Sequence, residues 1–466
     1  MSLNAIILNN LTKLKKYYFL GLTLCLYHFT LFSQVNPTWG KWIKNNSFEL
    51  SITDTVNLHD LSFLKQVLKD KKIVFLGENS HGVSEFTLLK SRIIRYLHDS
   101  LGFDVLVFES NAADAFAANM TISTSDVHMC IYNSISWLWH VEEIVPLFNF
   151  IKESHATKNP LNIAGVDITM SNGSYSFSHF LYNLISPINS SYAKEVQKSD
   201  SMFSRIGVRG WSGLLSRTEK DTFKIMRSKQ VKVYSDLINF INKNKDEFTQ
   251  SKSQNVEAAK FYLQSRIDFI YWYNRDSTYM GNKLQLKDSK MSLTNLFANF
   301  RDFMMSQNLK FLSTTLYPGK KIIVWAQDSH VKKRVYRMAT DSSYSKLTYT
   351  IGLFCYSGKG HTSDLEQAFG GSVPDSLIYE FKTPSDSLSI ESILHSSNYD
   401  NTFVDMLHQD KNFGNSWMFE TTKYSEWEGK DPAEINNIRN AWDGLILVNK
   451  ISPPKYLKYD YEYLKK

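Results

Sequence analysis

Short apolar runs alternate with amphipathic segments in the first third of the chain. Residues 73–77 (Ile-Val-Phe-Leu-Gly) and 104–108 (Asp-Val-Leu-Val-Phe) are typical of buried strands. Between them, apolar residues at helical spacing predict a helix over residues 84–97, and Gly102 ends it. Strand, helix and strand in this order predict a β-α-β unit with parallel pairing and a right-handed crossover.

The same alternation returns later, after a long interruption. Apolar runs predict further strands at residues 161–166, 321–326, 347–356, 377–381 and 445–449, and helical spacing predicts helices over 61–68 and 137–151. From 175 to 316 strand signals vanish, and long helical stretches such as 256–273 and 294–312 carry many aromatic residues. We therefore predict an α/β fold with a central, largely parallel sheet flanked by helices, and a helical insertion.

The chain begins with a segment that resembles an export signal. Three lysines precede an apolar run over residues 17–32, and Ser33 follows as a small residue before a cut. We predict a signal peptide at 1–33, a first α/β part at 35–174, the helical insertion at 175–316 and a second α/β part at 317–455. The mature protein would be periplasmic or secreted. An uncleaved N-terminal anchor is the alternative.

Charge and cysteine content narrow the choice of partners. The formal charge of +7 comes from 53 basic and 46 acidic residues; without the three leader lysines it is 50 against 46, or +4. This mild charge is spread evenly, which argues against a nucleic-acid partner. Cys130 and Cys355 would remain after cleavage and could form one bridge, but they do not make a disulfide framework. No later segment is long and apolar enough to cross a membrane.

Polar side chains follow four of the predicted strands. They are Glu78 with His81, then Glu109, then Asp167, and finally Asp328 with His330. Each carboxylate taken alone would be explained as a helix N-cap or turn residue. Because parallel strands place their carboxyl ends at one edge of a sheet, we expect the six side chains to surround one site.

Hydrolysis by an activated water suits this set of residues. Histidine can accept a proton near neutral pH, and a neighbouring carboxylate fixes its tautomer. The same residues could instead bind a divalent metal. The chain has no Gly-x-Ser-x-Gly elbow, and Ser80 lacks its glycine spacing, so an ordinary serine hydrolase is not indicated. There is also no His-Glu-x-x-His motif, P-loop or dinucleotide-binding glycine set.

Several blocks of the sequence resemble the erythromycin esterase family. The first block is Gly77-Glu78-Asn79-Ser80-His81-Gly82 with Glu85-Phe86. Later landmarks are Phe108-Glu109, Trp139 with Glu143, Gly165-Val166-Asp167, Arg301-Asp302, Asn308, Lys321, Trp325 through His330, Tyr349 to Gly358, and Trp442-Asp443-Gly444. The resemblance covers roughly residues 40 to 455.

This resemblance implies a catalytic arrangement. His81 would act as the general base on water, supported by Glu78, Glu109 and His330. Family members that confer resistance open the macrolactone ester of macrolide antibiotics, and a metal is usually unnecessary. We expect the substrate to be a small ester or lactone, with contacts from Asp167, Asp328, Lys90 and Arg301, and we expect no cofactor or metal.

The later block departs from the family pattern at one place. The family usually has Trp-Ala-His-Asn-x-His, whereas this chain has Trp325-Ala326-Gln327-Asp328-Ser329-His330. Glutamine forms hydrogen bonds but carries no proton at neutral pH, which argues against a macrolide as the substrate more than against hydrolysis. The sequence favours an exported carboxylic ester hydrolase. A metal-dependent hydrolase and a non-catalytic binding protein are the alternatives.

Overall fold

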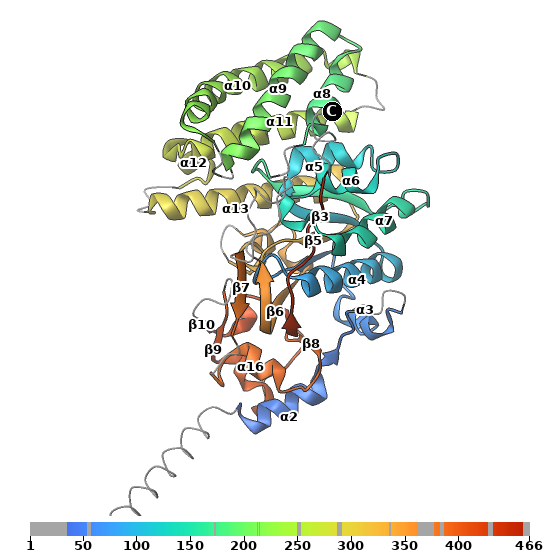
Figure 1. Ribbon diagram of the computed structural model, residues 1–466, viewed down its shortest axis with the longest axis vertical. Helices are drawn as coiled ribbons and strands as arrows, with labels where there is room; N and C mark the ends of the chain where they lie inside the picture. Colours follow the sequence, from blue (N-terminus) through green and yellow to red (C-terminus); the bar gives the residue numbers. More distant parts are fainter. Residues whose placement is uncertain are drawn as a thin grey trace, which may run out of the picture.

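The computed structural model describes residues 35–459 except 54–56, 172–173, 212, 214, 249–252, 287–290, 335–336, 362–376, 383–385 and 427–431 (Figure 1). The predicted signal peptide at 1–33 lies outside the described residues. Export and cleavage near Ser33 therefore stay predictions. No helix in the described part of the chain has the length and apolar character to span a membrane.

A nine-stranded sheet forms the centre of the molecule. Its strands are β1 (Phe48–Glu49), β2 (Ile73–Leu76), β3 (Phe103–Asn111), β4 (Asn162–Asp167), β5 (Lys321–Trp325), β6 (Thr348–His361), β7 (Ile378–Phe381), β8 (Asn401–Asp405) and β11 (Gly444–Ile451). The order is β1-β8-β11-β6-β2-β5-β3-β4, and β7 pairs with β6. All neighbours from β11 to β4 are parallel, and the pairs that involve β1, β7 or β8 with their neighbours are antiparallel. The predicted α/β fold with a largely parallel sheet is confirmed.

Helices cover both faces of the sheet. The helices of the described chain, including those that lie beyond the end of the sheet, are α2 (Pro37–Asn46), α3 (Leu64–Val67), α4 (Ser84–Leu101), α5 (Ala112–Asn119), α6 (Val127–Ser134), α7 (Val145–Ser154), α8 (Ser176–Ile185), α9 (Ser190–Trp211), α10 (Arg217–Lys243), α11 (Ser253–Tyr273), α12 (Ser277–Lys283), α13 (Leu293–Phe311), α14 (Asp328–Val331) and α16 (Ile390–His395). A separate two-stranded sheet pairs β9 (Thr421–Tyr424) with β10 (Ala433–Asn436).

The packing of strand β2 explains why its sequence is apolar at every position. Ile73 and Phe75 pack into the core that includes residues of α5, α8, α11 and α13. Val74 and Leu76 pack on the other face, in the core that includes residues of α4 and α7. A strand covered on both faces reads as a continuous apolar run because no side chain reaches water.

Tertiary pairing changed two of the expected local arrangements. Strands β2 and β3 are both parallel to β5, but β5 lies between them, so they are not paired with each other as predicted. The helix expected over 137–151 begins only at Val145, and two 3₁₀ turns, Trp137–Trp139 and Glu142–Ile144, precede it. Helix α4 ends as expected at Gly102, whose left-handed φ of +68° suits glycine.

Other differences lie at shorter elements. The helix expected over 61–68 is a 3₁₀ turn at His59–Leu61 followed by one helical turn in α3. Strands β1, β8, β9 and β10 were not predicted. None of these short strands contains a continuous run of four or more apolar residues, the signal that predicted β2 and β5.

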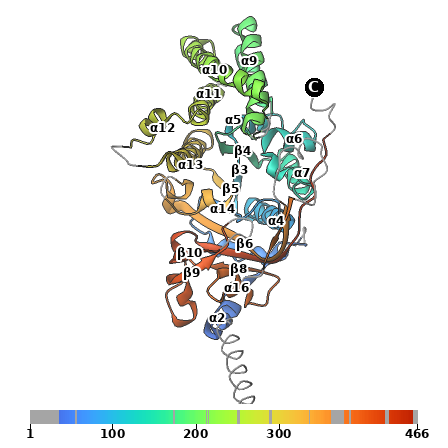
Figure 2. The same ribbon diagram turned by 60° about the vertical axis from the view of Figure 1, so that its left-hand side comes forward.

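Helices α8 to α13 occupy the segment predicted as a helical insertion, and the described residues between 175 and 316 contain no strand. Helices α8 to α11 form the green end of the molecule, opposite α2, in both ribbon views (Figures 1 and 2). Helix α13 runs back to the sheet and contacts β4. The boundaries of the four predicted segments stay predictions.

Both cysteines in the described part of the chain are buried and free. Cys130 lies on α6 and Cys355 on β6, and they form no disulfide with each other. They therefore act as small apolar core residues, the structural role that their surroundings favour.

Candidate active site

An acid–imidazole pair stands directly after β2. The carboxylate Oε1 of Glu78 lies 2.7 Å from Nδ1 of His81. Because an ionised carboxylate only accepts hydrogen bonds, this contact places the ring proton on Nδ1 and leaves Nε2 as the basic nitrogen. His81 is 8% exposed, so the imidazole is largely buried yet reaches solvent.

Three further donors hold the Glu78 carboxylate. Lys90 Nζ lies 2.6 Å from Oε2, the Trp325 indole N–H donates to Oε2 at 3.2 Å, and the Trp139 indole N–H donates to Oε1 at 2.9 Å. Burial by itself raises the pKa of Glu78, but Lys90 and His81 outweigh it and hold the pKa below its usual range. Glu78 therefore stays ionised and orients His81.

A second cluster forms where β3 and β4 end beneath α13. The guanidinium Nη2 of Arg301 donates to Glu109 at 2.8 Å and to Asp167 at 2.7 Å. Thr169 donates its backbone N–H to Asp167 at 3.2 Å. Burial by itself lowers the pKa of Arg301, but Asp167 and Glu109 raise it above its usual range, so the guanidinium is permanently charged.

His330 extends this cluster from α14. Its Nδ1 lies 2.6 Å from Asp302, and its Nε2 lies 3.1 Å from Glu109 Oε1 and 3.2 Å from Arg301 Nη1. A protonated Nε2 donates to Glu109, whereas a bare Nε2 accepts from Arg301. His330 thus stands where a proton can be held or released beside two charged groups of opposite sign. Arg337 forms an ion pair with the other oxygen of Asp302.

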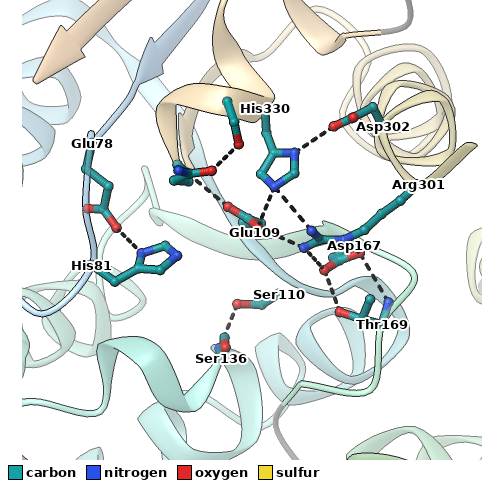
Figure 3. Close-up of polar contacts among 12 residues, drawn as sticks. Glu78, His81, Glu109, Ser110, Ser136, Asp167, Thr169, Arg301, Asp302 and His330 are labelled. Atoms are coloured by element: carbon teal, nitrogen blue, oxygen red, sulfur yellow. Dashed lines mark hydrogen bonds and ion pairs between the residues drawn. The ribbon is translucent and has the colours of Figure 1, made fainter. Parts of the chain in front are cut away.

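Glu109 lies between the two groups. Its other oxygen accepts the backbone N–H of Gln327 at 2.9 Å. Burial raises its pKa, but His330, Arg301 and His81 together lower it well below the usual range. Figure 3 shows the His81 ring directed from the Glu78 side toward the side on which Glu109 and His330 lie.

The structure thus brings together Glu78, His81, Glu109, Asp167, Arg301 and His330 at the carboxyl edge of β2, β3, β4 and β5 (Figure 3). Two other predicted residues lie elsewhere. Lys90 is fully buried on α4 and contacts the Glu78 carboxylate. It does not reach the exposed side of the site. Asp328 lines a separate small cavity. The roles assigned to all eight residues stay predictions.

Two residues that contact Glu78 and His330 were not predicted from the strand ends. Trp139 and Asp302 sit on elements away from the strand ends, and only the family resemblance drew attention to them. Their distance in sequence from Glu78 and His330 gives no local signal of contact.

The positive charge beside Glu109 and Asp167 comes from the guanidinium of Arg301. No group of three histidine, cysteine, aspartate or glutamate side chains suited to a metal occurs within the residues that the structure describes. The cluster is thus built around a fixed organic cation.

Comparisons with known proteins show the family to which the chain belongs. The erythromycin esterase family model matches residues 98–451. The putative hydrolase YbfO of Bacillus subtilis (strain 168) is 30% identical over 437 residues, 90% of this chain and 92% of that protein. Erythromycin esterase type II of Escherichia coli is 30% identical over 138 residues, 29% of this chain and 33% of that protein.

Solved structures show the same fold. A Bacillus cereus protein superposes with a TM-score of 0.68 at 20% identity, covering 91% of this chain and 99% of that one. An erythromycin esterase mutant, EreC in its open conformation, gives 0.58 at 14% identity, covering 89% and 99%.

Fold and site together define an α/β protein with an acid–imidazole pair at the carboxyl edge of its parallel sheet. The chain belongs to the erythromycin esterase family, as its motifs predicted. Membership of this family indicates hydrolase activity.

Proposed function

We propose that this protein hydrolyses a carboxylic ester or lactone, with His81 as the general base. The observation that carries the proposal is the 2.7 Å contact between Glu78 and His81, because Glu78 is itself held by Lys90, Trp139 and Trp325. A base whose tautomer and orientation are fixed in this way loses little freedom when it takes a proton.

The proposed reaction needs no covalent enzyme intermediate. His81 Nε2 removes a proton from water while the water oxygen attacks the ester carbonyl carbon. The carbon–oxygen bond to the alcohol then breaks, and His81 returns the proton to the leaving oxygen. Arg301 supplies the fixed positive charge near the site, and such a charge stabilises an oxyanion more strongly where water is scarce.

The test is hydrolysis of a panel of esters and lactones by the wild type and by His81→Ala. Asp405 and His408 offer a matched control, because their carboxylate–imidazole contact of 2.8 Å has the same three-residue spacing. His408 is not part of the candidate active site, and its side chain is 49% exposed. We expect His408→Ala to keep wild-type rates. Equal activity of His81→Ala and wild type on a hydrolysed ester would refute the proposed base.

We also propose export of the protein, on the strength of the lysine-rich start and the apolar run before Ser33. Mass spectrometry of protein from the producing cell should show a mature N-terminus near residue 34. An intact N-terminus would contradict cleavage, and cell fractionation would then identify an anchored form.

The metal-dependent alternative receives no support from the site, because Arg301 already satisfies Glu109 and Asp167. Dialysis against a chelator, followed by the same ester assay, tests it directly. Loss of activity that added divalent metal restores would replace the mechanism proposed for His81.

A further inference from the structure

A large cavity lies between α5 and α6 on one side and α8 and α11 on the other. Helix α5 contacts the other three helices there, and α8 lies beside α5 and α6 (Figure 1). The volume of the cavity is about 670 Å³, within the range of about 300–1,000 Å³ that is usual for sites of small organic ligands. The described residues that line it include none of the six that form the candidate active site.

One part of the cavity wall is apolar. Met120, Met129, Phe180 and Leu184 line it. The ring of Phe180 is held by an edge-to-face contact with Phe116 of α5, with the two ring centroids 5.2 Å apart. Met120 is 44% exposed, so the apolar wall reaches the surface of the protein. Because methionine side chains adapt to irregular apolar shapes, this wall suits the alkyl or ring body of a ligand.

The other part of the wall carries amide groups. Asn133, Asn183 and Asn255 line it, and an amide side chain both donates and accepts hydrogen bonds. Asn183 is exposed and Asn255 is half-buried, so both can be reached from the surface. Oδ1 of Asn133 accepts the hydroxyl of Ser174 at 3.2 Å, which ties α6 to the segment before α8. These amides suit hydroxyl groups of a ligand.

An aromatic side chain adds a wall that is fixed before any ligand binds. The ring of Tyr132, which also lines the cavity, packs against Tyr459 and His140, with ring centroids 5.2 and 6.0 Å apart. A wall that is already held in place loses little conformational freedom on binding. The cavity is therefore largely preformed.

The lining carries no full charge. Among the described residues that line the cavity there is no aspartate, glutamate, lysine or arginine. The lining also includes His179, whose Nδ1–H donates to the backbone carbonyl of Tyr175 at 2.8 Å. A charged group that entered would lose its water without meeting an opposite charge, which is unfavourable. The lining therefore favours a neutral ligand.

We propose that this cavity binds a neutral amphiphile, a molecule in which an alkyl or ring body is joined to a head with several hydroxyl groups. The body packs against the two methionines and Phe180, and the hydroxyl groups of the head bind the asparagine amides. The site goes beyond the proposed ester hydrolysis and does not depend on it, because His81 is not part of its lining.

The test is isothermal titration calorimetry of the full-length protein with octyl β-glucoside, below the concentration at which it forms micelles. This probe has no ester bond, so its binding is measured apart from hydrolysis. Glucose lacks the alkyl body, and octanoate and octylammonium replace the hydroxylated head by a charge. We expect octyl β-glucoside to bind about tenfold or more tightly than each of these three probes at pH 7.

Two variants place a carboxylate in the apolar wall. Met120→Glu and Met129→Glu should each weaken the binding of octyl β-glucoside about tenfold or more, and the second serves if the first does not fold. Met202→Glu is a matched control, because Met202 on α9 is 50% exposed and is not part of the described lining. We expect this control to bind as the wild type does. Circular dichroism checks that each variant is folded.

His81→Ala separates this proposal from the hydrolase function, since it should still bind octyl β-glucoside. Failure of ester hydrolysis with this binding intact would contradict only the proposed function. The amphiphile site would be refuted if octyl β-glucoside did not bind, or if glucose or a charged probe bound as tightly. It would also be refuted if the folded Met120→Glu and Met129→Glu variants bound no more weakly than Met202→Glu.

Discussion

Replacing Asp328 by Asn should stabilise the protein, and by an amount that grows with pH. Burial raises the pKa of Asp328 to about 8 in the folded protein, from an ordinary value of 3.8. An unfolded chain therefore ionises this residue at a pH where the folded chain keeps the proton. Asparagine has nearly the same shape, carries no proton that titrates, and is the residue that the family pattern has at this position.

The size of the effect follows from proton linkage. Because the folded pKa is raised, Asp328 costs the native state nothing well below pH 3.8, and the cost rises as the pH increases toward about 8. Each unit of difference between the folded and unfolded pKa corresponds to about 1.4 kcal/mol. At pH 7, Asp328 therefore lowers the free energy of unfolding by about 4 kcal/mol. Between pH 5 and pH 7 the advantage of Asp328→Asn should increase by about 2–3 kcal/mol.

Urea unfolding followed by circular dichroism at pH 5, 6 and 7 measures this trend. The difference between two pH values isolates proton linkage from any change in packing, since packing contributes equally at each pH. Asp246→Asn on a surface turn is a suitable control, and we expect its effect to be small at every pH. A stabilisation by Asp328→Asn that does not vary with pH, or that falls as the pH rises, would refute the reasoning.

The active-site predictions can be tested with one confirmed ester substrate. His81→Ala should lower kcat by about 10²–10⁴-fold, the usual contribution of a general base, as measured by steady-state kinetics. Glu78→Gln should lower kcat more than it changes KM, because the variant lacks the carboxylate that holds the tautomer of His81. An effect on KM alone would contradict this orienting role of Glu78. Gln327→His should leave activity intact or raise it, since it restores the imidazole that the family pattern has at this position, and a large loss would count against this expectation. Arg301→Lys should destabilise the fold by about 1–3 kcal/mol in urea, because lysine lacks the fork that serves two carboxylates; an unchanged midpoint would show that a point charge suffices.

Much of the fold could be predicted from local pattern. Strands β2, β3, β4 and β5 each contain a continuous apolar run because helices cover both faces of the sheet, and such runs are visible without any knowledge of contacts. The long helices α4, α11 and α13 also begin and end within four residues of their predicted bounds. Strand β8, which lies between β1 and β11, was not predicted, because the polar residues Asn401, Thr402 and Asp405 leave it no continuous apolar run.

The candidate site was predictable only in part. Glu78, His81, Glu109 and Asp167 lie at or just after the carboxyl ends of their strands, so the rule that parallel strands share a carboxyl edge was enough to group them. Asp328 also follows a strand, but its side chain lines a small cavity and does not join the cluster of Glu78, His81, Glu109 and Asp167. The direction in which a side chain leaves a turn depends on packing, here on the bare Cα of Gly77, and strand order says nothing about it.

The sequence by itself determined the fold class, the family and the acid–imidazole pair, because each rests on residues close together in the chain or on motifs in fixed order. Tertiary structure alone decided that β5 separates β2 from β3, and that Arg301 from α13 bridges Glu109 and Asp167. It also decided which polar groups are left buried without partners. These features depend on contacts between segments more than 100 residues apart, and such contacts are set by the summed packing of the whole core, not by any local run of residues.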